Sequence, residues 1–368
     1  MRVFLMGAKP SMDLNSIRAL NERFDHTGKN TGNQVIGYGL IKALSADHIS
    51  WDHRLTPQDV SEQFDVIVVA AANFLHPSFD FTGMANFIEA TPLPCVIVGL
   101  GAQSNDYSTD IVLHPGTERL IKIISERSKF IGVRGKFTAR VLSARGINNF
   151  QIIGCPSYYM SGQRELRIEK PELPARPKVA INLSRDVIRH SFNPDLATAA
   201  IHKCIALAID ADADFIAQTE HEEMQIAMHG CVQRRGDVGS LMSVWGGLGI
   251  GRELERWICS HMRVYWSVAD WLDEMKSYDF VFGQRFHGNM VAIQAGTPAV
   301  VICHDSRTTE MCEFLALPFI RLEDADEISI DRLYERFDAD ALAARYRVLF
   351  ARYVDFLRSN DLVTALSA

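Results

Sequence analysis

The segment VFGQRFHGNMVAIQAGTPAVVI, residues 281–302, decides the fold class of this chain. Its apolar start ends at Gly283, the next residues fit a helix that ends near Gly296, and a β-branched run follows Pro298. A strand, a crossover helix and a second strand in so short a stretch are typical of a parallel sheet. The segment therefore predicts an α/β fold.

The same alternation extends to both sides of this segment. In the first half we expect strands over residues 3–7, 65–71, 94–100, 130–134 and 150–155, with helices over 33–44, 116–126 and 135–144. In the second half we expect strands over residues 178–184, 214–219, 262–266, 279–283 and 298–303. Two parallel sheets follow from this pattern.

A chain of 368 residues is long enough for two domains, each with its own core. Residues 161–177 contain three prolines and many charges, which indicates a linker. We therefore predict a Rossmann-like domain over 1–160 and a second one over 178–337. The remainder, 338–368, has apolar residues at helical spacing and is expected to form an amphipathic helix that packs on the body.

Composition excludes several classes of protein. The net charge of −7 argues against a broad basic surface for nucleic acid. No apolar run reaches the roughly 18 residues that span a bilayer, and the first residues do not form a signal sequence, so we expect a cytoplasmic protein. The seven cysteines are widely spaced with no CxxC pair, and we expect them to be reduced and mostly buried, with neither a disulfide framework nor a zinc site.

Three residues that follow the strand ending at Gly283 are the strongest candidates for chemistry. Arg285, His287 and Gly288 lie where a strand meets a helix N-terminus, a position that favours a bound anion. His287 is the candidate catalytic residue, and Gly288 permits a close approach by a ligand. The alternative is that His287 caps the helix and that Arg285 pairs with a surface carboxylate.

Glycine-rich loops in the first half are the next candidates, as residues that line a cleft between the domains. Asn30, Gly32 and Asn33 precede a helix, and Gly101 and Gln103 follow a strand. An ordinary loop with a helix cap, or a tight turn, explains these residues equally well.

Other polar segments favour a structural interpretation. In residues 304–310, Asp305 or Ser306 is expected to cap a helix, with Arg307 and Glu310 near the cleft. The run over 219–223 fits the exposed first turn of a helix better than a metal site. Residues 231–252 are rich in glycine and are predicted to form a loop.

Several segments together resemble the polysaccharide pyruvyl transferase family. The strongest is RFHGNMVAIQAGTPAVVI, which is followed by TTEMCEFL. The others agree in order and spacing: NTGNQVIGYGLIKAL (30–44), CVIVGLGAQ (95–103), and FIGVRGKFTARVLSARGI (130–147) followed by IIGCPSYYM. One departure is Cys155, where many relatives carry Asp before the proline.

The resemblance implies a GT-B-like pair of facing domains, with phosphoenolpyruvate as donor substrate, a saccharide as acceptor, and neither a metal nor a cofactor. His287 would be the general acid, its pKa raised by the charges of the donor. Arg285 and Arg185 would bind the donor on the C-terminal domain, and the N-terminal domain would hold the acceptor.

Two other functions stay open at this stage: a nucleotide-sugar glycosyltransferase of the same fold, and a non-catalytic protein that binds sugar or polyanion. The sequence does not name the acceptor sugar or show whether it is lipid-linked. It also leaves open peripheral association with a membrane and the formation of homo-oligomers.

Overall fold

The computed structural model describes residues 1–104, 108–184, 188, 191–245 and 251–367. The first half contains a parallel sheet of order β2-β1-β3-β4. Its strands are β1 (Arg2–Gly7), β2 (His48–Ser50), β3 (Val66–Ala70) and β4 (Cys95–Val98). A bridge between Leu100 and Val133 joins this sheet to the parallel pair β5 (Ile131–Val133) and β6 (Phe150–Ile152). The helices of this half are α1 (Leu20–His26), α2 (Gly32–Ala43), α3 (Pro57–Gln63), α4 (Thr82–Glu89), α5 (Pro115–Arg127) and α6 (Lys136–Ser143).

The second half contains a parallel sheet of order β12-β11-β10-β7-β8-β9. Its strands are β7 (Val179–Asn182), β8 (Asp214–Ile216), β9 (Met262–Arg263), β10 (Phe280–Gly283), β11 (Ala299–Cys303) and β12 (Phe319–Arg321). The helices are α8 (Pro194–Asp210), α9 (His221–His229), α10 (Arg235–Trp245), α11 (Gly251–His261), α12 (Val268–Met275), α13 (Phe286–Ala295), α14 (Ser306–Leu315) and α15 (Ile330–Glu335).

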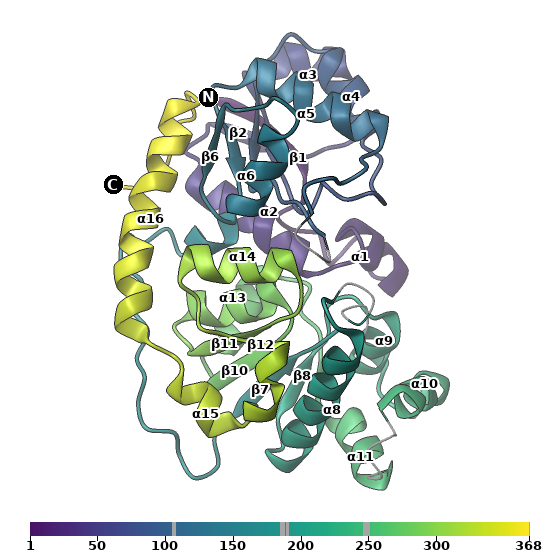
Figure 1. The fold of residues 1–368 in the computed structure, drawn as a ribbon. Coiled ribbons are helices and arrows are strands. Elements are labelled where there is room, and N and C mark those ends of the chain that lie inside the picture. The colour runs from purple at the N-terminus through teal and green to yellow at the C-terminus, as the bar shows by residue number, and fades with distance from the viewer. Residues whose placement is uncertain (105–107, 185–187, 189–190, 246–250, 368) are drawn as a thin grey trace.

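The strand orders identify both halves as Rossmann-like domains that face each other (Figure 1). The second sheet, read from β9, has the order 3-2-1-4-5-6 of dinucleotide-binding folds, and the first begins 2-1-3-4 as in flavodoxin-like folds. Ligands of such sheets bind beyond the carboxyl ends of the strands, where the order reverses. In the second domain this point lies between β7 and β10, the strand that leads to His287.

The two domains are connected by a segment without helix or strand and by a long helix. Residues 161–177 contain only turns, bends and irregular backbone. Helix α16 (Ala339–Ser359) then runs beside both domains (Figure 1). On its buried side Tyr346 and Tyr353 pack against Tyr159 of the short helix η1 (Pro156–Tyr159).

Two expectations from the sequence are wrong. The region 231–252, predicted as a loop, contains helix α10, because Val238, Leu241 and Trp245 recur at helical spacing and are buried; its residues 246–250 lie outside the described part of the chain. The expectation that all cysteines are reduced fails at Cys231 and Cys259, which form a disulfide because α11 brings their Cα atoms to 5.4 Å. The other five cysteines are free and buried.

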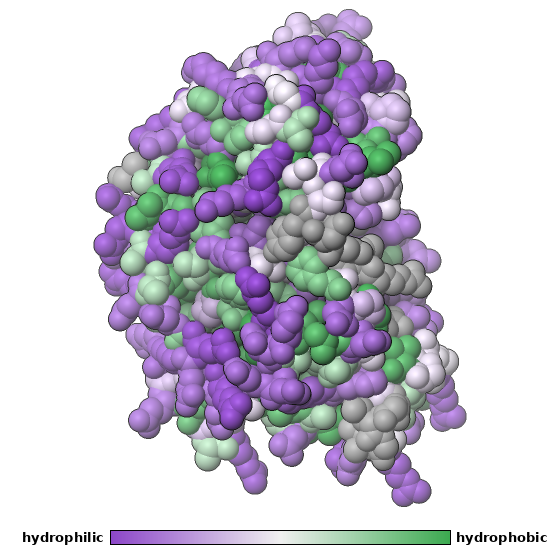
Figure 2. Space-filling model, viewed as in Figure 1, coloured by the Kyte–Doolittle hydropathy of each residue, from purple (hydrophilic) through white to green (hydrophobic). Residues whose placement is uncertain are grey.

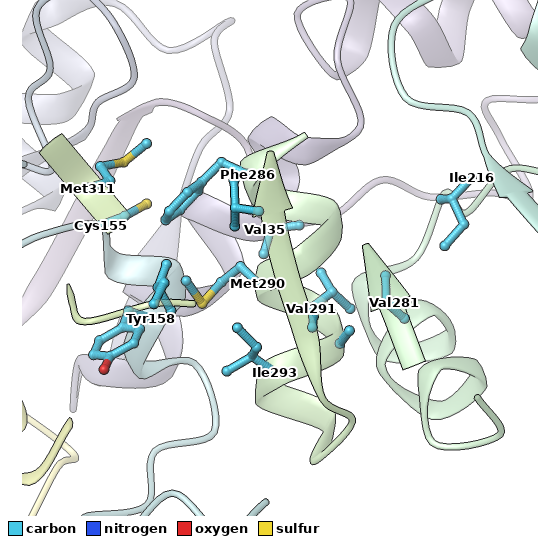
Figure 3. Close-up of a cluster of buried hydrophobic side chains, with 14 of the residues drawn as sticks. Val35, Cys155, Tyr158, Ile216, Val281, Phe286, Met290, Val291, Ile293 and Met311 are labelled. Atoms are coloured by element: carbon cyan, nitrogen blue, oxygen red, sulfur yellow. The ribbon is translucent and has the colours of Figure 1, made fainter. Parts of the chain in front are cut away.

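Helix α13 is buried on all sides. Its residues from Phe286 to Gln294 are buried except His287, which is partly exposed. Figure 3 shows Met290, Val291 and Ile293 of α13 among the side chains of a buried hydrophobic cluster. A helix without a polar face packs wholly inside a protein, so the position of its first turn is fixed by the core.

The surface is polar over both domains. Figure 2 shows hydrophilic residues spread over the visible face, with hydrophobic residues between them. In the part of the chain that the structure describes, no helix has the length and apolar character needed to span a membrane.

Hydrogen bonds between Glu310 of α14 and the first turn of α6 join the two domains. The carboxylate of Glu310 accepts hydrogen bonds from the backbone N–H groups of Phe137 (2.8 Å) and Thr138 (3.3 Å) and from the Thr138 hydroxyl (2.9 Å), at the first turn of α6. A Cβ at Gly135 would lie 2.4 Å from this carboxylate, so the contact requires glycine there. Burial raises the pKa of Glu310 to about 7 despite these donors.

Glu310→Gln should change how stability depends on pH. A carboxyl group whose pKa is higher in the folded state than its usual 4.5 binds more protons when folded. Wild-type stability should therefore decrease as pH rises from 4.5 to 7, by up to about 3 kcal/mol relative to Glu310→Gln. Denaturant unfolding across this pH range measures the difference. Glu313→Gln, at an exposed residue of the same helix, is the control. If the stability of wild type and that of Glu310→Gln change with pH in parallel, the pKa of Glu310 is not raised in the folded protein.

Candidate active site

A small pocket with a volume of about 40 Å³ lies between the two domains, around the first turn of α13. The N-terminal domain contributes Asn30 and Arg134, and the C-terminal domain contributes the rest of the lining. Those residues are Gln218, Gln284, Arg285, Phe286, His287, His304, Arg307 and Met311. The pocket therefore forms only when the two domains meet.

The position of His287 is fixed from both sides by close packing against glycines. A Cβ at Gly288 would lie 2.7 Å from Nε2 of Gln218, so glycine lets α13 approach the ends of β7 and β8. Across the interface, a Cβ at Gly32 would lie 3.0 Å from the Cβ atom of His287 and 3.1 Å from its Nδ1. The N-terminus of α2 is thus in direct contact with the imidazole ring.

The surroundings of His287 favour its neutral form. Burial lowers its pKa well below 6.5, and the positive charges of Arg134 and Arg307 lower it further. An anion bound beside the two arginines would offset their part of this effect. This finding differs from the sequence-based expectation of a raised pKa, which applied to the site with its donor bound.

Arg134 is a buried cation without a carboxylate partner among the described residues. Its side chain is 1% exposed and donates to the carbonyl oxygens of Gly99 (2.8 Å) and Ala71 (3.1 Å) and to Oδ1 of Asn73 (3.1 Å). Burial lowers its pKa, yet a guanidinium stays charged in proteins. The carboxyl group of Glu310 acts on this charge from a distance, but the direct hydrogen-bond partners of Arg134 are all neutral. A buried charge held in this way is costly, which favours an anionic ligand.

Arg285 lines the same pocket but is already paired. Its Nη2 donates to both carboxylate oxygens of Glu220, at 3.0 and 2.9 Å, and to the hydroxyl of Thr219. Its Nε donates to the carbonyl of Leu183 at 3.3 Å. The carboxylate of Glu220 is buried. Arg285 is therefore neither a free anion-binding residue nor the partner of a surface carboxylate, as the two interpretations of the sequence had it. Part of its charge is neutralised before any ligand binds.

Three other side chains of the pocket have N–H groups that make no hydrogen bond among the described residues. Nε of Arg307 and the Nε2 atoms of Gln218 and Gln284 are buried and have no hydrogen-bond partner in the described part of the chain. Arg307 is held at the start of α14 by Asp305, 3.5 Å away, which also caps that helix. Unused N–H groups and guanidinium ions are the groups that proteins use to bind phosphate and carboxylate.

The other predicted site residues fall into two groups. Asn30 lines the pocket, whereas Asn33 holds the preceding loop through the carbonyl of Thr27 at 3.0 Å. Gly101 leaves room for Arg134, since a Cβ there would lie 2.9 Å from its Cδ.

Two more of the predicted residues join the domains without lining this pocket. Gln103 donates to Asp305 at 3.1 Å, and Glu310 contacts α6 as described above. Arg185 lies outside the described residues.

Cys155 touches His287 from the N-terminal domain. Its Sγ lies 3.6 Å from Nε2 of the ring and accepts a hydrogen bond from the Ser157 hydroxyl at 3.0 Å. The residue that departs from the family pattern is therefore in contact with the candidate catalytic group.

Sequence reasoning missed Arg134 as a site residue and gave Arg307 only a place near the cleft. A signal was available for Arg134, because it directly follows β5 and precedes Gly135, the pattern that singled out Arg285. The proximity of the two arginines to His287 depends on how the domains dock, which no local pattern encodes.

The fold and this pocket define a two-domain α/β protein with a cationic, histidine-bearing site at the domain interface. A model of the polysaccharide pyruvyl transferase family matches residues 30–306, so the chain belongs to that family. This confirms the resemblance noted in the sequence. A comparison with curated proteins gives no match.

Solved structures similar to this chain include three sugar-nucleotide complexes or epimerases. They are UDP-GlcNAc 2-epimerase from Neisseria meningitidis bound to UDP-GlcNAc (11% identity, 98% of this chain and 100% of that chain, TM-score 0.45), UDP-N-acetylglucosamine 2-epimerase from Rickettsia bellii (14%, 97% and 97%, 0.45), and HepE from Anabaena in complex with UDP and glucose (9%, 98% and 97%, 0.46). The fold assignment rests on the strand order of this chain and not on these likenesses.

Arg307→Gln should raise the pKa of His287, because it removes one of the two cations that disfavour the imidazolium ion. An NMR titration of the ligand-free protein, with the His287 signal assigned through His287→Gln, measures the shift. Arg358→Gln, which removes an exposed arginine of α16, should leave the titration unchanged. An unchanged titration in Arg307→Gln would show that the two groups do not interact.

Proposed function

We propose that this chain transfers the pyruvyl group of phosphoenolpyruvate to a saccharide and forms a pyruvate ketal with release of phosphate. The observation that carries the proposal is the buried, unpaired guanidinium of Arg134 beside His287 in the pocket between the domains. Membership of the polysaccharide pyruvyl transferase family supports a saccharide as acceptor.

The charges of the pocket suit a small ligand with several negative charges. Arg134 and Arg307 are the cations that act on His287, and the amides of Gln218 and Gln284 add unused donors. Phosphoenolpyruvate carries a phosphate and a carboxylate, each of which takes planar, bidentate donors well. A neutral saccharide alone would leave Arg134 uncompensated.

Donor binding would also prepare the acid. The negative charge of phosphoenolpyruvate offsets the two arginines, so the pKa of His287 rises and the ring gains a proton. The resulting imidazolium donates that proton to the methylene carbon of the enol, which becomes a methyl group, and the adjacent carbon becomes an oxocarbenium-like centre.

Two bonds to the acceptor then complete the ketal. One saccharide hydroxyl attacks the oxocarbenium-like carbon, phosphate leaves, and a second hydroxyl closes the ring. The two hydroxyl protons restore the acid and protonate the phosphate, so that protons balance over the cycle. Arg134 and Arg307 of the interface pocket stabilise the leaving phosphate throughout.

His287→Gln should abolish turnover and retain donor binding, since it removes the proton donor and leaves both arginines. Phosphate release from phosphoenolpyruvate in the presence of acceptor measures turnover, and calorimetry measures binding. His229→Gln, at an exposed histidine that lines neither this pocket nor any other part of the proposed site, is the matched control. Turnover close to wild type in His287→Gln would eliminate the general-acid role.

Proton uptake distinguishes this role from a structural one. If the donor raises the pKa of His287, wild type should take up more protons per bound phosphoenolpyruvate near neutral pH than His287→Gln. Calorimetry in buffers of different ionisation enthalpy gives this number for each variant. Equal uptake in the two proteins would mean that the ring does not gain its proton on binding.

Arg307→Gln should weaken donor binding by about one to two orders of magnitude, the loss of one charge-assisted interaction of roughly 1.5–3 kcal/mol. Arg307 is the better target because Arg134 also holds three oxygens of its own domain. Arg358→Gln should bind phosphoenolpyruvate as wild type does. If both variants bind equally well, the donor does not occupy this pocket.

A further inference from the structure

A second pocket lies on the N-terminal domain, at the carboxyl ends of β1 and β2. It is lined by Lys9, which follows β1, by His26 at the end of α1, and by the segment from Ile49 to Arg54 that ends and follows β2. Its volume is about 440 Å³. We call it the cationic pocket. Neither the family match nor the proposed reaction assigns it a role.

The cationic pocket collects positive charge that the protein does not balance. Lys9 is partly buried, and in the described part of the chain its ammonium group has neither an ion pair nor a hydrogen bond. Burial lowers its pKa. Burial also lowers the pKa of His26, and the nearby charges of Lys9 and His53 lower it further.

The carboxylate in the lining is already neutralised. Oδ2 of Asp52 lies 2.6 Å from Nη2 of Arg54, and this pair leaves the ammonium group of Lys9 without a counter-charge in the lining. A partly buried ammonium group is unfavourable unless an anion joins it, and the nearby imidazoles of His26 and His53 can add hydrogen bonds to such an anion. The arrangement therefore fits an oxyanion as ligand.

Trp51 gives the cationic pocket an aromatic surface beside its charges. The indole ring is partly exposed and lines the same space as Lys9. Exposed aromatic rings bury the apolar faces of ligands at little cost in conformational entropy. A ligand with a flat apolar face and an attached anionic group matches both features.

The cationic pocket is close to the pocket that holds His287. Residues His26 and Asn30 belong to the two pockets and are four positions apart, so their Cα atoms are separated by at most about 14 Å. The intervening backbone is compact, because Gly28 N bonds to the carbonyl of Asp25 and Lys29 N to that of Phe24. Lining residues of the two pockets are therefore close neighbours along the chain.

We propose that the cationic pocket binds the anionic group of the saccharide acceptor, with the sugar against Trp51 and the anion on Lys9, His26 and His53. This inference rests on the proposed function for the identity of the acceptor. The anion is a phosphate or a carboxylate carried by the saccharide. Its place fixes the acceptor on the N-terminal domain, with further sugar units directed toward His287.

The test uses the full chain and four probes: glucose 1-phosphate, glucuronate, glucose and inorganic phosphate. Calorimetry measures the affinity of each probe, and no turnover is needed. We expect a charged sugar to bind at least tenfold more tightly than glucose and more tightly than inorganic phosphate. The tighter of the two charged sugars identifies the anion as phosphate or carboxylate.

Three variants connect the affinity to the cationic pocket. Lys9→Gln should weaken binding of the charged sugar about tenfold, the effect of one charge-assisted hydrogen bond. Lys9→Arg, which keeps the charge, should weaken it less. Lys42→Gln removes an exposed lysine of the same domain and should have no effect. Equal affinities for Lys9→Gln and Lys42→Gln would overturn the proposal.

Trp51→Leu tests the saccharide part separately. It should weaken the binding of glucose 1-phosphate or glucuronate and leave the affinity for inorganic phosphate unchanged. If inorganic phosphate binds as tightly as the charged sugars, the cationic pocket does not recognise a saccharide and the proposal fails.

Phosphoenolpyruvate titrations of the same variants separate this test from that of the proposed function. Donor affinity should be unchanged in Lys9→Gln, because Lys9 does not line the pocket of His287. Loss of donor binding in wild type with intact, Lys9-dependent sugar binding would reject the pyruvyl transfer and keep the cationic pocket. Intact donor binding together with sugar binding that does not depend on Lys9 would reject only the proposal for the cationic pocket.

Discussion

The burial of the Arg134 guanidinium between two domains is the constraint on which the site depends. Three neutral oxygens of the N-terminal domain orient it, and the carboxyl group of Glu310 acts on its charge without forming an ion pair in the described part of the chain. The same charge lowers the pKa of His287, so the ligand-free site is electrostatically incomplete. A ligand that supplies negative charge both binds there and changes the protonation of the histidine.

The remaining features of the interface maintain this arrangement. Helix α13 is enclosed by core residues, and its first turn meets Gly32 of the facing domain, so the imidazole cannot move without repacking. Glu310 reaches from α14 to the first turn of α6, directly after Arg134 and Gly135. Arg285 contributes less free charge than its position suggested, because Glu220 already pairs with it.

The two pockets divide the chemistry between the domains in a way that suits a two-substrate reaction. The interface pocket has compact, buried donors that match a small and highly charged donor substrate. The cationic pocket is more open and adds an aromatic ring, as expected for a larger saccharide. The short segment from His26 to Asn30 joins lining residues of both, so the proposed donor and acceptor sites are close along the chain.

The sequence by itself determined the two parallel sheets, the position of most strands, and the placement of Arg285, His287 and Gly288 after β10. These depend on hydrophobic period and on glycine and proline at element ends, which are local properties. It did not reveal helix α10, the disulfide between Cys231 and Cys259, or the burial of Arg134 in the pocket beside His287. Only the tertiary structure decided these, together with the low pKa of His287, because burial and charge proximity arise from contacts between residues far apart in the chain.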